Sequence, residues 1–477
     1  MLSYQKKLNK LFYVVLGLPA TAMGFGLSVQ IAVLSWILSS KYGLDIHEVG
    51  IVWAAGPIAG ILGQIIVGVI SDKVWFWGGR RKPFIIIGGI LAAIMIYCLP
   101  RLDLIDHALG IGNIMAVAIT VALTLDLSIN VGFNPTRSII ADVTPEGNHR
   151  TKGFSWMQAI SNFFGASAYL ISALLDNYLL MNIGIGLILA FTIIPVLFIE
   201  EPRKLNEQKS DTPEAKISYK ELFITLTPLY GYLIFAIYGI GLKLEFYNGS
   251  STAIYILTAI SVLLMLSTFM AKEPKQAAAI ANERSFRKLL AAHSFTWLGV
   301  QTMFVYGFFF ALHRFTDNDT FAAGKIIGWA FFLLNAFGSL FPIYFLEPLS
   351  KKIGRVNTHI ISIGLMATGY IGIAFFASNQ YILYVLMVIL SIGWSSLVSL
   401  PFAIMTEKID KSKMGLYMGV FNLSVVLPQL LASFVIGILI KAYIEEYSWI
   451  VFFVSGISLG ISTFLWSFVK EKAATDS

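Results

Sequence analysis

The chain has 477 residues, of which 57% are hydrophobic and only 13% are charged. A soluble domain carries roughly 45–50% apolar and about 25% charged residues, so the composition excludes a soluble protein. The net charge of +7 comes from short basic clusters between apolar runs, which is typical of membrane loops and argues against a nucleic-acid partner. The single cysteine, Cys98, excludes an intramolecular disulfide. We expect an all-α protein that crosses the lipid bilayer many times.

A membrane-spanning helix needs about 20 predominantly apolar residues, and the sequence contains fourteen such runs. Their Lys and Arg distribution, with the basic segments on one side, predicts that both termini are cytoplasmic and that the protein resides in the cell (inner) membrane. The predicted spans are 11–38, 47–71, 83–100, 110–142, 150–175, 178–199, 222–242, 252–270, 289–313, 323–349, 356–377, 379–406, 414–440 and 447–469.

The spans divide into six, two and six. This division predicts an N-terminal six-helix bundle over 1–199, a linker with two additional transmembrane helices over 200–288, and a C-terminal six-helix bundle over 289–477. A weak repeat relates the bundles, because an apolar helix leads into GGRRK in the first half and into KKIGR in the second. Two six-helix units with a basic turn after the second helix resemble the major facilitator fold, and such parallel repeats place a substrate site between the halves.

Two charged residues lie within the fourth predicted span, LTLDLSINVGFNPTRSIIADV. Asp126 and Arg137 are eleven residues apart, which in a helix brings them within about 20° of one face and separates them by roughly 16 Å. A charge at this depth costs about 2.5–3.5 kcal/mol or more, so we expect both to face a cavity or a partner. The spacing suits two separate binding positions, one for a proton at Asp126 and one for a polar ligand at Arg137. A structural charge network, or snorkelling at the helix end, is the alternative.

Charged residues also gather where spans meet the predicted cytoplasmic side. Carboxylates beside basic turns can form salt bridges that hold an inward opening shut and break when it opens. Ordinary positive-inside topology accounts equally well for any single cation. As a set, we expect a cytoplasmic gate formed by Asp72, Arg80, Arg81, Asp142 and Glu407.

Amide and aromatic side chains inside spans are candidates for sugar binding, since sugar sites combine hydrogen-bonding groups with aromatic faces. His47 begins the second span, where it could be reached from outside, whereas we expect His293 and His313 to be interfacial. Most aromatics serve packing or interfacial belts. The candidate substrate-binding residues are Gln30, Gln64, His47, Asn162, Trp297, Gln301 and Asn422, with Gln429 close to the last.

Nucleotide- and metal-binding motifs are missing from the sequence. It contains no GxxxxGK[ST] loop, no HExxH and no Cys–His metal spacing. We therefore expect no enzymatic activity, no cofactor and no metal site, and any uphill transport has to draw on an ion gradient.

Four segments together resemble one transporter family. SDKVWFWGGRRKPFI and LDLSINVGFNPTRSIIADV are similar to signatures of the sucrose–proton symporters of plants and their bacterial and animal relatives, within the major facilitator superfamily. SLPFAIMTEK and MGVFNLSVVLPQ are similar to the later signatures. The resemblance implies that Asp126 is the proton-coupling carboxylate. It also implies that Arg137 either contacts the sugar or pairs with the Asp126 carboxylate. Gln30, His47 and Asn162 fall at matching positions.

Two departures from that family are visible. The plant proteins carry acidic residues late in the seventh helix, where this chain has MFVYGFFF, and the two additional helices have no counterpart in the usual twelve. The expected function is proton-coupled uptake of a disaccharide, an α-glucoside such as sucrose or maltose, by alternating access in a monomer. Sodium coupling is an alternative. A drug–proton exporter is disfavoured because the fifth span has no proline, and a sugar sensor because the chain has no long cytoplasmic domain.

Overall fold

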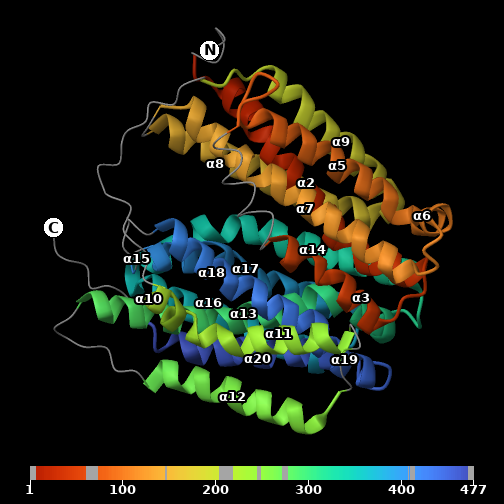
Figure 1. Cartoon of the computed structure of the whole chain (residues 1–477), viewed down its shortest axis with the longest axis vertical. Helices are drawn as coiled ribbons and strands as arrows, with labels where there is room; N and C mark the ends of the chain where they lie inside the picture. Colours follow the sequence, from red (N-terminus) through yellow and green to blue (C-terminus); the bar gives the residue numbers. More distant parts are fainter. Residues whose placement is uncertain are drawn as a thin grey trace. The chain divides into compact units, whose positions relative to one another are not determined.

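The computed structural model describes residues 7–60, 74–145, 148–202, 219–243, 246, 249–270, 278–406, 408 and 414–470. These residues are helical, apart from loops, turns and an isolated β-bridge between Phe76 and Gly79. In chain order (Figure 1) the elements are α2 (Lys10–Ser40), α3 (Ile46–Trp53), α5 (Lys82–Cys98), η1 (Leu99–Arg101), α6 (Leu102–Leu109), α7 (Ile114–Val143), α8 (Asn148–Leu174), α9 (Asn177–Leu197), α10 (Tyr219–Thr225), η2 (Thr227–Leu229), α11 (Tyr230–Lys243), α12 (Ser251–Met270), α13 (Ala278–Phe315), α14 (Thr320–Phe341), η3 (Pro342–Leu346), α15 (Glu347–Ile353), α16 (Arg355–Phe376), α17 (Gln380–Thr406), α18 (Met414–Leu431), η5 (Ala432–Ile436), α19 (Gly437–Tyr443) and α20 (Ile450–Trp466).

The 3₁₀-helices η1 and η2 and the π-helices η3 and η5 interrupt the α-helices.

Ten helices in the described residues are long and apolar enough to cross a membrane, and two shorter apolar helices cover Thr227–Leu242 and Ile450–Trp466. The prediction of an all-α, multi-pass chain is thereby confirmed. The count of fourteen spans stays a prediction. The predicted span 47–71 continues into residues that the structure does not describe, and α8, which covers the predicted span 150–175, is helical but less apolar than the ten.

The chain forms two compact units, of which the first contains Met1–Lys209 and Thr316–Ala336. In this unit α2 packs against α7, α8 and α9, while α5 packs against α7 and α9. The contact of α5 with α7 requires glycine, because a Cβ on Gly88 would lie 2.7 Å from the carbonyl oxygen of Ser128. Apolar side chains from all five helices fill one core cluster, which includes Phe12, Ile85, Ile140, Met157 and Val196.

The second unit contains Ser210–Phe315 and Phe337–Ser477. Here α13 packs against α18 and α20, α16 packs against α17 and α20, and α11 packs against α12 and α18. The six helices of each predicted bundle can be numbered in chain order. In both bundles the first helix packs against the fifth and the sixth, and the third helix packs against the fourth and the sixth. The repeated pairing supports the internal repeat seen in the sequence. Helix α12 leaves most of its apolar surface exposed, as a lipid-facing helix does.

Two segments expected to be loops are helical. The polar stretch 271–288 becomes helix from Ala278 onward, because its run of Ala, Glu, Arg and Lys has high intrinsic helix propensity. The segment between the predicted spans 83–100 and 110–142 contains α6, which ends at Gly110 in a left-handed conformation with φ of 64°, where glycine carries no steric cost. The longer α13 moves His293 from the expected interfacial position into the middle of a helix.

Candidate functional site

The carboxylate of Asp126 on α7 is buried against α2. Asp126 is 6% exposed and accepts a hydrogen bond of 2.8 Å at Oδ2 from Nε2 of Gln30, which is 3% exposed. The backbone that follows α3 closes the other side, since a Cβ on Gly56 would lie 3.4 Å from Asp126 Oδ2. The oxygen of the Gln30 amide is buried and has no hydrogen-bond partner among the described residues. The fold thus brings Gln30, which was expected to bind substrate, into contact with Asp126.

Arg137 lies three turns further along α7 and does not share that burial. Its side chain is exposed, and its guanidinium carbon lies 4.4 Å from the centre of the Phe133 ring. A cation over an aromatic face gains about 0.5–1 kcal/mol at an exposed site. The guanidinium thus has an aromatic support, and no hydrogen bond joins its N–H donors to another of the described residues. A ligand-binding role for Arg137 stays a prediction.

The other N-terminal candidates that the structure describes, His47 and Asn162, have hydrogen-bond partners other than Asp126. His47 is half-buried in the first turn of α3, and its backbone N–H donates to the side chain of Asp45, the N-cap of that helix. Asn162 is exposed on α8, where its oxygen accepts a 2.7 Å hydrogen bond from Gln158. Gln64 lies outside the described residues.

Three of the expected gate residues, Arg80, Arg81 and Asp142, form a cluster in which a buried ion pair is central. Arg81 Nε lies 3.1 Å from Asp142 Oδ2, with only 8% and 12% of the two side chains exposed. This pair joins the start of α5 to the end of α7. Arg80 is half-buried beside it, and Asp72 and Glu407 lie outside the described residues.

Glu201, which sequence reasoning missed, holds this cluster in place. Its carboxylate accepts hydrogen bonds from the backbone N–H groups of Arg80, Arg81 and Lys82, with donor–acceptor distances of 2.8–2.9 Å. Gly79 makes this approach possible, because a Cβ there would lie 2.5 Å from Glu201 Oε1. An acidic pair after an apolar span was the only available signal, and nothing in it points to a turn about 120 residues earlier.

The second unit has its own line of polar and aromatic side chains along α13. His293, which is 1% exposed, accepts a 2.9 Å hydrogen bond at Nε2 from the indole N–H of Trp297. The ring of Trp297 lies edge-on to Trp394 of α17, with centres 6.5 Å apart. The expectation of an interfacial His293 was wrong. His293 is buried and fixes the orientation of Trp297, a candidate binding residue. Trp394 was not anticipated, although it is a tryptophan within a predicted span.

One turn further along α13, Gln301 is 4% exposed and accepts a 3.1 Å hydrogen bond from Nε2 of Gln429 on α18. Asn422 lies two turns before Gln429 on α18 and is half-buried. Trp297 and Gln301 therefore occupy one face of α13, with α17 and α18 supplying the neighbouring aromatic and amide groups. In the described part of the chain, no three His, Cys, Asp or Glu side chains gather where a metal ion could be held.

Comparison with known proteins now identifies the family. The model of the Major Facilitator Superfamily matches residues 17–433 and 318–476, so the chain belongs to that family. Among solved structures, the nucleoside transporter NupG (D323A mutant) superposes with a TM-score of 0.67 at 13% identity, covering 96% of this chain and all of that one. An auto-inhibited peptide transporter of the POT family gives 0.66 at 12% identity, covering 98% and 99%. These likenesses establish the fold.

The curated relatives are transporters as well. Sucrose transport protein SUC4 of Arabidopsis thaliana is 28% identical over 171 residues, which cover 34% of this chain and 33% of that protein. The general alpha-glucoside permease of Schizosaccharomyces pombe is 28% identical over 148 residues, or 28% and 27% of the two chains. The matches thus span about a third of these relatives.

Proposed function

We propose that the protein is a secondary transporter that takes up a disaccharide together with a proton. The observation that carries the proposal is the buried contact between Gln30 and Asp126. Protonation of Asp126 would remove a charge from a membrane site in which the structure provides one side-chain donor. The two curated relatives, one named for sucrose and one for alpha-glucosides, support an α-glucoside such as sucrose or maltose as the sugar.

The amide of Gln30 suits both protonation states of Asp126. In the present arrangement its nitrogen donates to the carboxylate. A half-turn of the amide would present its oxygen, which has no partner in the described part of the chain, as an acceptor for the proton of a neutral carboxyl group. The same two side chains would then hold the charged and the neutral form in turn, as a proton-coupling site requires.

Each unit offers its own candidate group for sugar hydroxyls, Arg137 in the first and Trp297 in the second. Arg137 lies above the Phe133 ring, and Trp297 has an indole face whose orientation is fixed by His293 and Trp394. Sites of this kind combine a few placed polar groups with aromatic walls. Alternating access would expose them first to one side of the membrane and then to the other.

Arg81, Asp142 and Glu201 would stabilise the cytoplasmic ends of α5, α7 and α9. A buried ion pair that loses one partner leaves an uncompensated charge, at a cost of about 3–5 kcal/mol. Such a cluster could act as a gate, because its buried interactions hold the helix ends together until they separate during transport. This assignment, with both termini in the cytoplasm, follows from the basic segments of the sequence.

Uptake of labelled sucrose, maltose and trehalose into proteoliposomes, with and without an imposed pH gradient, tests the proposal. Accumulation of at least one sugar that depends on the proton gradient is expected. Accumulation that follows a sodium gradient instead, or no transport of any of the three, would contradict it.

A further inference from the structure

A polar pocket lies at the end of the first unit opposite to the Arg81 cluster. Helix α5 begins beside Arg81, and α9 ends close to Glu201, whereas the pocket is lined by the last residues of α5 and the first two turns of α9. Its volume is about 360 Å³. Because these helices cross the membrane, the pocket lies at the other membrane surface. It takes no part in the contacts around Asp126.

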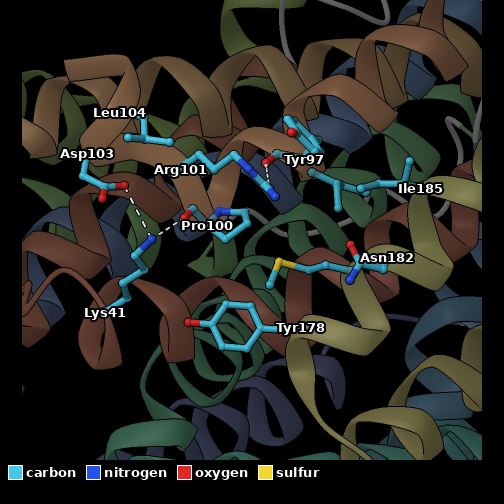
Figure 2. A pocket seen from close by; sticks show the side chains of 11 residues that line it. Lys41, Tyr97, Pro100, Arg101, Asp103, Leu104, Tyr178, Asn182 and Ile185 are labelled. Atoms are coloured by element: carbon cyan, nitrogen blue, oxygen red, sulfur yellow. Dashed lines mark hydrogen bonds and ion pairs between the residues drawn. The ribbon is translucent and has the colours of Figure 1, made fainter. Parts of the chain in front are cut away.

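Two cations line this pocket. Arg101 stacks on Tyr97, with its guanidinium carbon 3.8 Å from the ring centre, and donates one N–H to the Tyr97 carbonyl oxygen at 2.8 Å. Lys41, which follows α2, donates to the carbonyl oxygen of Pro100 and lies 3.5 Å from Asp103. Figure 2 shows the two cations on either side of Pro100. With two cations against one carboxylate, the pocket is positively charged.

Helix α9 completes the pocket with neutral polar groups. Tyr178 and Asn182 face the cations in Figure 2 and offer a hydroxyl and an amide to a ligand. The turn that carries Arg101 is held rigidly, because the hydroxyl of Tyr42 donates to the Leu99 carbonyl oxygen and accepts from the Leu102 N–H. Burial raises the pKa of Tyr42, so this hydroxyl stays protonated and can make both bonds. The pocket is therefore preorganised.

An apolar strip on α5 leads into the pocket. Ile90, Leu91, Ile94 and Tyr97 are 37%, 38%, 46% and 50% exposed. Ile94 lies three or four residues after Leu91 and Ile90, and Tyr97 three residues later, which puts them on one helix face that continues to Arg101. A membrane helix that exposes apolar side chains below a basic, hydrogen-bonding pocket matches a molecule with an anionic head and an acyl chain.

We propose that this pocket binds the phosphodiester head of an anionic phospholipid at the membrane surface, with an acyl chain along the α5 strip. The guanidinium of Arg101 has four N–H groups beyond the one used by Tyr97 and can contact phosphate oxygens in bidentate fashion. Lys41 supplies a second, point-like charge. A free phosphate ion shares the head-group chemistry but makes no use of the strip.

Native mass spectrometry of the delipidated full chain in detergent tests the proposal, with dioleoyl phosphatidylglycerol, dioleoyl phosphatidylcholine and inorganic phosphate as probes. Wild type should bind phosphatidylglycerol at a lipid concentration at least tenfold lower than the concentration at which it binds phosphatidylcholine. The Lys41→Gln/Arg101→Gln variant should need at least tenfold more phosphatidylglycerol. The Lys325→Gln/Lys441→Gln variant, which removes the same charge from exposed positions elsewhere, should behave as wild type.

A gain of binding separates the proposal from loss of structure. Asp103→Asn removes the carboxylate that competes for Lys41, so it should tighten phosphatidylglycerol binding about threefold. Equal lipid retention by wild type and the Lys41/Arg101 variant would overturn the proposal. So would unchanged or weaker binding by Asp103→Asn, equal loss in the control variant, or displacement of the lipid by an equal concentration of inorganic phosphate.

Discussion

The side-chain amide of Gln30 donates a 2.8 Å hydrogen bond to the carboxylate of Asp126, joining α2 to α7 across 96 residues of sequence. Both side chains are almost completely buried. The pair combines an ionisable group in a membrane helix with an amide whose oxygen has no hydrogen-bond partner among the described residues. An ionisable residue inside a membrane span is by default a candidate functional site, and the proposed proton-binding role of Asp126 rests on this arrangement.

Replacing Gln30 with Leu should lower proton-driven uptake at least tenfold. The carboxylate would lose its side-chain donor, and a hydrogen bond to a charged group contributes about 1.5–3 kcal/mol. Initial rates of labelled sugar uptake under an imposed pH gradient measure the effect. Gln380→Leu, which removes an amide at the start of α17 in the second unit, should transport normally. Normal uptake by Gln30→Leu would mean that the amide does not assist the carboxyl group.

Breaking the buried ion pair should destabilise the protein far more than breaking an exposed one. Arg81→Ala leaves Asp142 buried without its partner, and we expect a loss of about 3–5 kcal/mol in the free energy of unfolding. The pair of Glu347 with Lys351 is 59% and 73% exposed, so Lys351→Ala should cost less than about 1 kcal/mol. Thermal unfolding in detergent compares the two variants. Similar unfolding midpoints for the two variants would show that the buried Arg81–Asp142 pair contributes no more to stability than the exposed pair.

Alanine at position 79 should displace Glu201 from its three backbone donors. The added Cβ would come within 2.5 Å of Glu201 Oε1, a distance that forces the carboxylate or the turn to move. We expect a lower unfolding temperature and faster proteolysis near residue 80. Gly460→Ala is the matched control, because a Cβ there meets nothing within 4 Å and alanine favours a helix by about 0.5–1 kcal/mol.

Truncating Trp297 should weaken sugar binding without uncoupling the proton. Trp297→Ala removes the indole that His293 and Trp394 orient. We expect KM to rise about tenfold, corresponding to about 1.4 kcal/mol, with an unchanged ratio of protons to sugar. Trp449→Ala, at the start of α20, should leave KM unaltered. A changed proton ratio with normal KM would place Trp297 outside the sugar site.

Much of the first unit could be anticipated because its information is local. The periodicity of one helix places Asp126 and Arg137 on α7, and the cost of intramembrane charge singles them out. What the sequence could not supply was their different surroundings, since Gln30 and Gly56 reach Asp126 through tertiary packing. Position along a span indicates depth in the membrane but not which neighbour a side chain meets.

The second unit was less predictable for the same physical reason. His293 was placed at the interface because the helix was expected to start near residue 289, but α13 begins at Ala278. Polar residues with high helix propensity extend a membrane helix beyond its apolar part, so hydropathy alone misjudges its ends. Glu201 escaped notice because its partners are backbone N–H groups, which leave no mark in a sequence.

Accumulation and exchange by the Asp126→Asn variant test the central claim most directly. A single charge moving through about 100 mV supplies about 2.3 kcal/mol, enough for roughly fifty-fold accumulation of a sugar carried with one proton. Asparagine keeps the shape of the side chain and removes its titration. The variant should exchange labelled for unlabelled sugar across the membrane but fail to concentrate it under a pH gradient or a membrane potential. Sugar accumulation at the wild-type level in Asp126→Asn proteoliposomes would contradict a proton-coupling role for Asp126.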